Sequence, residues 1–190
     1  DSSPKERETQ ICMNDYKYVD LILGKQCQTK MGRGGIHPLE FKTFSKEMQN
    51  AITNYCQAGG NFFVSGAYVA SDLWDNRLVK ANEEDKKFAM EVLKYKWRVG
   101  QAARNGKVKS VASPFPEITG SYTYYQDLNP ESYVVESPDA LEPAAQGAFT
   151  ILRYSENNLS AGIAYKGNYK TCVLGFPFEA IRTVTESCLL

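Results

Sequence analysis

The sequence predicts an α/β fold in which helices cover a mostly parallel sheet, with an antiparallel insertion around residues 106–135. Two observations predict this class. Between residues 18 and 67, a strand-like run, a helical run, two glycines, a buried apolar run and a tight turn follow one another. After Gly106, short segments separated by turn residues replace this order, which is typical of antiparallel strands.

The first half of the chain carries the α/β signal. Residues 18–24 form an apolar run closed by a glycine, which predicts a strand. Apolar residues at helical spacing over 44–55 predict a helix, which the glycines at 59 and 60 end. Residues 61–65 then predict a short buried strand. A second helix is expected from an N-cap at Asn82 to Trp97, with acidic residues in its first turn.

The second half predicts further strands and a final helix. A hairpin is expected around Lys166-Gly167-Asn168, between strands at 161–165 and 169–175. A last helix is expected from Phe178 to the end of the chain. The other predicted strands in this half are 107–111, 121–125, 132–135 and 149–154.

One domain is expected, preceded by a short polar segment. Residues 1–16 are mostly polar and charged, which predicts a flexible N-terminal segment. Residues 17–190 show no interior linker and predict a single domain. Because the sequence lacks an initiator Met and ends inside a predicted helix, we expect it to be part of a longer chain.

Composition excludes several classes of function. Lys and Arg number 22, as do Asp and Glu, so a strongly basic nucleic-acid-binding surface is not expected. No apolar run approaches the roughly 18 residues of a membrane span. The chain contains a single histidine, His37, and five scattered cysteines without a C-x-x-C motif. This composition predicts neither a metal site nor a cofactor.

The carboxyl end of the buried strand is the first candidate site. In α/β sheets, sites gather where parallel strands end, which here is Ser65, Gly66, Ala67 and Tyr68. Ser65 would be a nucleophile if His37 served as its base. The alternative is that Ser65 is a structural residue that hydrogen-bonds to backbone.

Asp72 and Trp74 follow at the same sheet edge. Together they predict a carbohydrate-binding platform, with the indole stacked on a sugar and the acid accepting hydroxyl groups. With a second carboxylate, Asp72 could also serve in acid–base cleavage of a glycan. The alternative is a helix N-cap beside a packed tryptophan.

Three runs resemble a known family. The run from Ala58 to Ala67 resembles the strand and turn before the nucleophile in the class I glutamine amidotransferase-like superfamily. The runs over 152–158 and 173–179 resemble the amidotransferase-like domain of secreted bacterial xanthan-lyase-like proteins. The resemblance implies a flavodoxin-like three-layer α/β sandwich. It places the family's cysteine at Gly66 or Ala67 and leaves only Glu179 as a match to its other catalytic residues, so glutamine hydrolysis is not expected.

Three functions follow as expectations. The first is a non-catalytic domain that binds a glycan or a neighbouring module, in an extracellular or periplasmic protein, as the resemblance implies. Its ligand would lie against Ser65 to Tyr68, Asp72 and Trp74, with Glu179 across the turn. The second is a hydrolase, polysaccharide lyase or glycosidase that uses Ser65 or Asp72. The third is a structural domain that packs against its neighbours in a longer chain.

Overall fold

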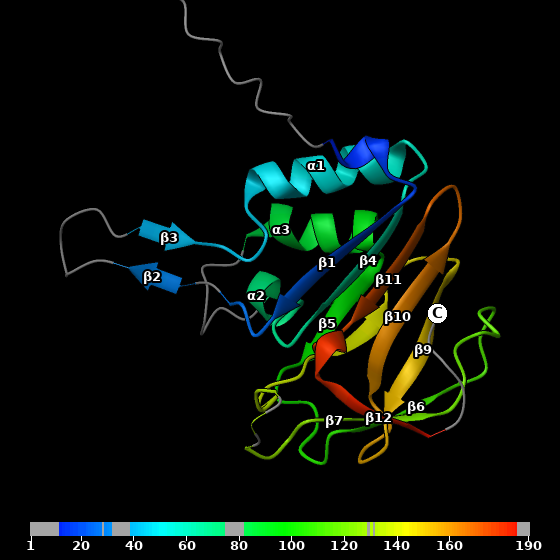
Figure 1. Cartoon of the computed structure of the whole chain (residues 1–190). Coiled ribbons are helices and arrows are strands. Elements are labelled where there is room, and N and C mark those ends of the chain that lie inside the picture. Colours follow the sequence, from blue (N-terminus) through cyan, green and yellow to red (C-terminus); the bar gives the residue numbers. More distant parts are fainter. Residues whose placement is uncertain are drawn as a thin grey trace, which may run out of the picture.

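An eight-stranded mixed sheet forms the centre of the computed structural model, which describes residues 12–27, 29–31, 39–74, 82–128, 130 and 132–185. The sheet order is β1-β4-β11-β10-β9-β6-β7-β12, and the sheet curls into a half-barrel (Figure 1). Its strands are β1 (Tyr18–Gly24), β4 (Asn61–Gly66), β6 (Lys107–Ser110), β7 (Ser121–Tyr124), β9 (Ala148–Tyr154), β10 (Ser160–Lys166), β11 (Lys170–Leu174) and β12 (Ile181–Thr185).

The remaining elements flank this sheet. Two small antiparallel sheets pair β2 with β3 and β5 with β8. Helices α1 and α3 lie over one face of the large sheet (Figure 1). The bounds of these elements are η1 (Met13–Asp15), β2 (Thr29–Met31), β3 (Leu39–Phe41), α1 (Lys46–Gln57), α2 (Ser71–Trp74), α3 (Glu83–Phe88), η2 (Ala89–Leu93), β5 (Tyr95–Val99), β8 (Ala140–Pro143) and η3 (Phe178–Ala180).

Local sequence explains where α1 begins and ends. Ser45 is its N-cap, and the Ser45 hydroxyl accepts a hydrogen bond from the Met48 amide at 3.3 Å. The helix ends before Gly59, whose φ of +90° lies in the region that favours glycine. A Cβ at Gly60 would lie 2.3 Å from the Tyr55 ring, so that position also requires glycine. The chain can therefore turn at once from α1 into β4.

Alternation along the strands separates two cores. Phe62 and Val64 of β4 point toward the helices and join a core that includes Ile52 and Tyr55 of α1. Phe63, the residue between them, points to the other face, which we call the inner face. The inner core lies within the curl of the sheet and is rich in aromatic residues: Tyr122, Tyr124, Tyr154 and Phe176.

The predicted flavodoxin-like three-layer sandwich is wrong. Only β1 with β4 and β4 with β11 run parallel in the large sheet, and every other described pairing in it is antiparallel. The predicted insertion is not an addition either, because β6 and β7 are members of the large sheet. The cause is topological: the short strands after Gly106 pair with strands distant in sequence, and few helices lie between them to cover a second face.

Some predictions of individual helices and strands are confirmed, and others are wrong. The strand at 18–24, the helix N-cap at Asn82 and the hairpin between β10 and β11 are confirmed. The predicted final helix is wrong: a short η3 leads into β12, which pairs with β7. Residues 132–135 form no strand, and Trp97 lies in β5 rather than at a helix end.

Some expectations fall on residues outside the described ranges. These are His37, Cys188 and most of the predicted N-terminal segment, residues 1–11. Among the described cysteines, Cys12, Cys56 and Cys172 are free thiols. Each helix in the described part of the chain is too short or too polar to span a membrane.

Candidate functional site

The predicted strand-end site around Ser65 is closed. Ser65 is fully buried, and its hydroxyl has no hydrogen-bond partner among the described residues. Ala67 is also buried, and its amide donates to the Gly24 carbonyl at 2.9 Å. A Cβ at Gly66 would lie 2.9 Å from the Leu23 Cβ, so the turn is tightly packed against β1. No ligand can reach the Ser65 hydroxyl in this arrangement, and the expected hydrogen bond to backbone is not formed either.

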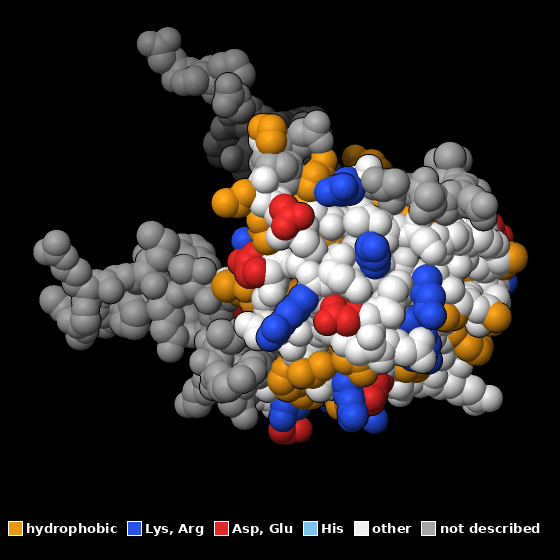
Figure 2. Space-filling model, turned by 90° about the horizontal axis from the view of Figure 1, so that it is seen from below, with side chains coloured by type: hydrophobic (Ala, Val, Ile, Leu, Met, Phe, Trp, Pro, Cys, Tyr) orange, Lys and Arg blue, Asp and Glu red, His pale blue; other side chains and the backbone are white. Residues whose placement is uncertain are grey.

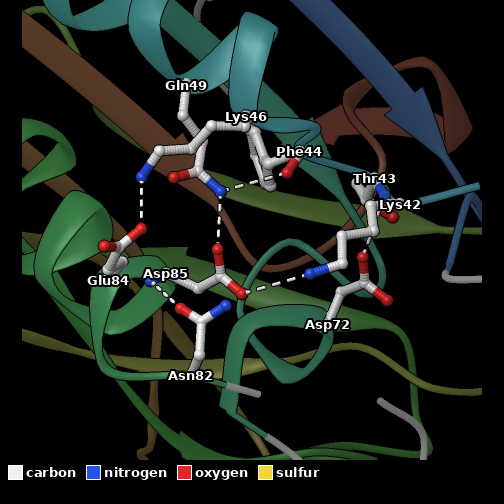
Figure 3. Close-up of polar contacts among 9 residues, drawn as sticks. All are labelled: Lys42, Thr43, Phe44, Lys46, Gln49, Asp72, Asn82, Glu84 and Asp85. Carbon is white, nitrogen blue, oxygen red and sulfur yellow. Dashed lines mark hydrogen bonds and ion pairs between the residues drawn. The ribbon is translucent and has the colours of Figure 1, made fainter. Parts of the chain in front are cut away.

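Asp72 and Trp74 have structural contacts that differ from those of a sugar platform. Asp72 is buried in α2, and its Oδ2 accepts a hydrogen bond from the Thr43 amide at 3.1 Å (Figure 3). Trp74 is half-buried and packs on the buried Tyr95 ring, with 6.2 Å between ring centroids. The indole is thus in contact with the core.

A polar network joins the segment before α1 to α3 (Figure 3). The buried Gln49 amide donates to the Asp85 carboxylate at 2.7 Å and to the Phe44 carbonyl at 3.1 Å. Lys42 lies 3.6 Å from the same carboxylate, and the Asn82 side chain caps α3. A small cavity of about 260 Å³ lies among these residues. These polar groups satisfy one another's hydrogen-bonding needs, so the network has a structural role.

Tyr68 and Glu179 lie beyond the carboxyl ends of β1 and β4. Burial raises the pKa of the half-buried Tyr68 hydroxyl. Glu179 is exposed and accepts a hydrogen bond from the Tyr133 hydroxyl. A Cβ built on Gly24 would lie 3.2 Å from Glu179 Oε1, and Gly24 is in register with Gly66. Glu179 therefore lies across the turn from the predicted site, but the turn itself offers no reachable reactive group.

Sequence reasoning missed Asp139, which is fully buried. Its Oδ2 accepts hydrogen bonds from the Ala70 amide at 2.8 Å and from the Ser71 amide and hydroxyl at 2.7 and 3.1 Å. Its Oδ1 accepts from the Trp97 indole at 3.2 Å. Burial nevertheless raises the pKa of Asp139 to about 7. These contacts fix the turn into α2, and nothing local in the sequence marks this aspartate among the others.

The inner face carries a groove of about 460 Å³. Its floor follows from strand register: Asp20, Phe63, Cys172 and Ala164 lie side by side on β1, β4, β11 and β10. Successive side chains alternate between faces, so all four point away from the helices. We call this cavity the inner-face groove.

The walls of the groove come from distant segments. Phe178 of η3 contacts Phe63 edge-on, with 5.5 Å between ring centroids. Phe115 and Ile118, from the loop between β6 and β7, form another wall. Tyr18, which is largely exposed, lies at the rim. Because the lining comes from both halves of the chain, no single motif in the sequence marks it.

The groove contains few charged groups. Burial raises the pKa of the Asp20 carboxyl, and the negative charge of Glu179 adds to the shift. Burial also raises the pKa of the Cys172 thiol to about 12, with Asp20 as a smaller cause. A thiol with this pKa stays protonated near neutral pH and is a poor nucleophile. Among the described residues, no cluster of three or more His, Cys, Asp and Glu could hold a metal ion.

Comparison with known proteins identifies no family. No protein-family model matches the chain, and the search of curated proteins finds no match. A solved structure described as "mmIFT52 N-terminal domain" is weakly similar, with a TM-score of 0.38 and 16% identity. The match covers 73% of this chain and 63% of that one, so less than two thirds of its length is represented.

The sequence-based resemblance to class I glutamine amidotransferase-like and xanthan-lyase-like proteins was therefore wrong. The comparisons support neither family, and the mostly antiparallel sheet differs from the fold that the resemblance implied. The extracellular or periplasmic location rested on that resemblance alone and stays an untested expectation. The fold and the inner-face groove are the features on which a function can be argued.

Proposed function

We propose that this chain is a binding domain without a reaction of its own, and that its inner-face groove holds an apolar segment of a neighbouring polypeptide module. The observation that carries the proposal is the groove itself, which has Phe63 and Ala164 on its floor and Phe115, Ile118 and Phe178 in its walls. Its volume of about 460 Å³ falls in the range of roughly 300–1,000 Å³ that is usual for ligand sites.

The lining favours apolar side chains over a glycan. Sugars require many hydrogen-bond partners, and the amide and aliphatic hydroxyl side chains of this lining are already occupied. The Asn61 amide donates to the Lys17 carbonyl at 2.9 Å, and the Thr171 hydroxyl donates to the Leu93 carbonyl at 3.2 Å. Asp20 and Lys170 are the charged side chains of the lining. An apolar segment would gain by removing Phe63, Phe178 and their neighbours from water.

The site also lacks the arrangement that the enzyme alternative needs. The Ser65 hydroxyl is buried, with no acid or base in hydrogen-bond contact among the described residues. Asp72 is buried and accepts from the backbone at Thr43. Charged side chains of both signs are interspersed on the face shown in Figure 2, which offers no broad patch of one sign. A binding role therefore has more support than a hydrolase or lyase.

Selection from a displayed library of random heptapeptides tests the proposal. We expect apolar peptides to be recovered on the wild-type domain and to lose at least tenfold in affinity on Ile118→Asp, which places a charge in the groove wall. Leu128→Asp is the matched control, because Leu128 is 95% exposed and does not line the groove. The proposal is wrong if no apolar peptide is recovered, or if both variants bind the recovered peptides as the wild type does.

Calorimetry with neutral and acidic oligosaccharides separates the glycan alternative. Under the proposal, these sugars release no heat of binding. If an oligosaccharide does release heat on binding and Trp74→Ala abolishes that heat, the function lies at the strand-end residues rather than in the groove.

A further inference from the structure

Two lysines lie directly opposite each other on neighbouring strands, and one of them lines the inner-face groove. Lys166 ends β10 and Lys170 begins β11, and the two residues are paired across the antiparallel hairpin. Ala164 and Cys172, two residues inward on the same strands, face the groove, so strand alternation places both lysines on the inner face. Lys170 is itself part of the groove lining.

This pairing is unfavourable without an anion. Like charges directly opposite on neighbouring strands repel each other and destabilise the sheet. Both lysines are exposed, and neither pairs with an acidic side chain in the described part of the chain. Some other lysines of the chain do pair with acidic side chains: Lys25 is 2.6 Å from Glu136, and Lys46 is 2.7 Å from Glu84. Lys170 lines the groove and Lys166 is its cross-strand neighbour, and neither has an acidic partner among the described residues.

We infer that the polypeptide segment held in the groove carries an acidic residue next to its apolar side chains, and that Lys166 and Lys170 bind this carboxylate. The inference rests on the proposed function and specifies the chemistry of the partner. The apolar residues supply most of the affinity by burial, whereas the carboxylate fixes the direction in which the segment lies. A carboxylate between the two ammonium groups would also remove their mutual repulsion.

Two synthetic versions of one recovered apolar heptapeptide test this inference. One version carries a terminal Glu, and the other carries a Gln at the same position. The comparison is made once with this residue at the N-terminal end of the peptide and once with it at the C-terminal end. We expect the Glu version to bind the wild-type domain about three- to tenfold more tightly in one of the two placements. That advantage falls as salt rises from about 0.05 to 0.5 M, because the ion pair lies at the rim.

A double-mutant cycle assigns the effect to these lysines. The preference for Glu over Gln is expected to disappear on Lys166→Gln/Lys170→Gln and to persist on Lys96→Gln, a control on β5 outside the groove lining. Removing the repulsion is expected to leave the Tm unchanged or to raise it by about 1–3 °C, so lost affinity would not reflect unfolding.

The outcomes separate the inference from the function on which it rests. Equal binding of the Glu and Gln versions in both placements would overturn the acidic partner while leaving the groove as a binding site. A Glu preference that survives the double lysine substitution would also overturn it. Absence of binding by either version would overturn the proposed function itself.

Discussion

Asp139 links a single residue to the pH dependence of stability. Its folded-state pKa of about 7 lies above the ordinary value of 3.8, because burial disfavours its charged form. Between these two values the native state holds a proton that the unfolded chain has released. The free energy of unfolding should therefore decrease as pH rises from about 4 to 7 and level off above. Urea denaturation at several pH values measures this slope.

Asp139→Asn is the matched variant for that slope. The amide cannot ionise, so this contribution to the decrease between pH 4 and 7 should vanish. If the variant shows the same pH dependence as the wild type, another group is responsible for it.

Ser65 is a second buried polar residue, and its removal is expected not to destabilise the fold. Its buried hydroxyl lacks a hydrogen-bond partner, so Ser65→Ala should leave stability unchanged or raise it by up to about 1 kcal/mol. Ser71→Ala is the control, because the Ser71 hydroxyl donates to Asp139 and its loss should cost about 1 kcal/mol. Thermal denaturation compares the two variants. Destabilisation of Ser65→Ala by more than that of Ser71→Ala would show that the Ser65 hydroxyl has a partner.

At the scale of elements, the polar network between α1 and α3 depends on the side-chain amide of Gln49. Gln49→Leu removes the donor of two buried hydrogen bonds, to Asp85 and to the Phe44 carbonyl. We expect a loss of about 2 kcal/mol in the free energy of unfolding, because the remaining groups stay buried. Lys46→Gln breaks only the exposed contact with Glu84 and should leave stability unchanged. Equal effects of the two variants would contradict this account.

β1 forms one edge of the large sheet. No described strand pairs with its outer side, and Ile22 is 54% exposed there. Such an edge favours association between copies, so Ile22→Lys should slow concentration-dependent aggregation, measured by light scattering. Leu128→Lys removes a more exposed apolar residue away from any strand and should have less effect. The edge has no such role if Leu128→Lys is equally effective.

Elements that local chemistry determines were predictable from the sequence. The Asn82 cap, the positive φ at Gly59 and the turn between β10 and β11 each leave a signal within a few residues. The segment from 181 to 185 is rich in β-branched residues, which favours a strand, but Phe178, Ile181 and Thr185 also fit a helical spacing, which favoured the wrong prediction. Short apolar runs carry this ambiguity because both periods fit them.

At the scale of the whole molecule, long-range pairing could not be predicted. β6 lies between β9 and β7, and β12 pairs with β7, more than 50 residues away in sequence. Hydrophobic periodicity shows which residues form a strand but not which strand lies next to it. The groove depends on such pairings, since Asp20, Phe63 and Cys172 meet only when β1, β4 and β11 align. The strand-end rule for parallel sheets therefore directed attention to Ser65 instead.

The most direct measurement is NMR mapping of methyl and amide signals as a recovered heptapeptide is titrated into the domain. We predict that the largest shifts occur at Ile118 and Ala164 and in the amides around Phe63 and Cys172, on the inner face. Shifts confined to Tyr68, Asp72 and Trp74, with Ile118 and Ala164 unchanged, would contradict the account and return the site to the carboxyl end of β4.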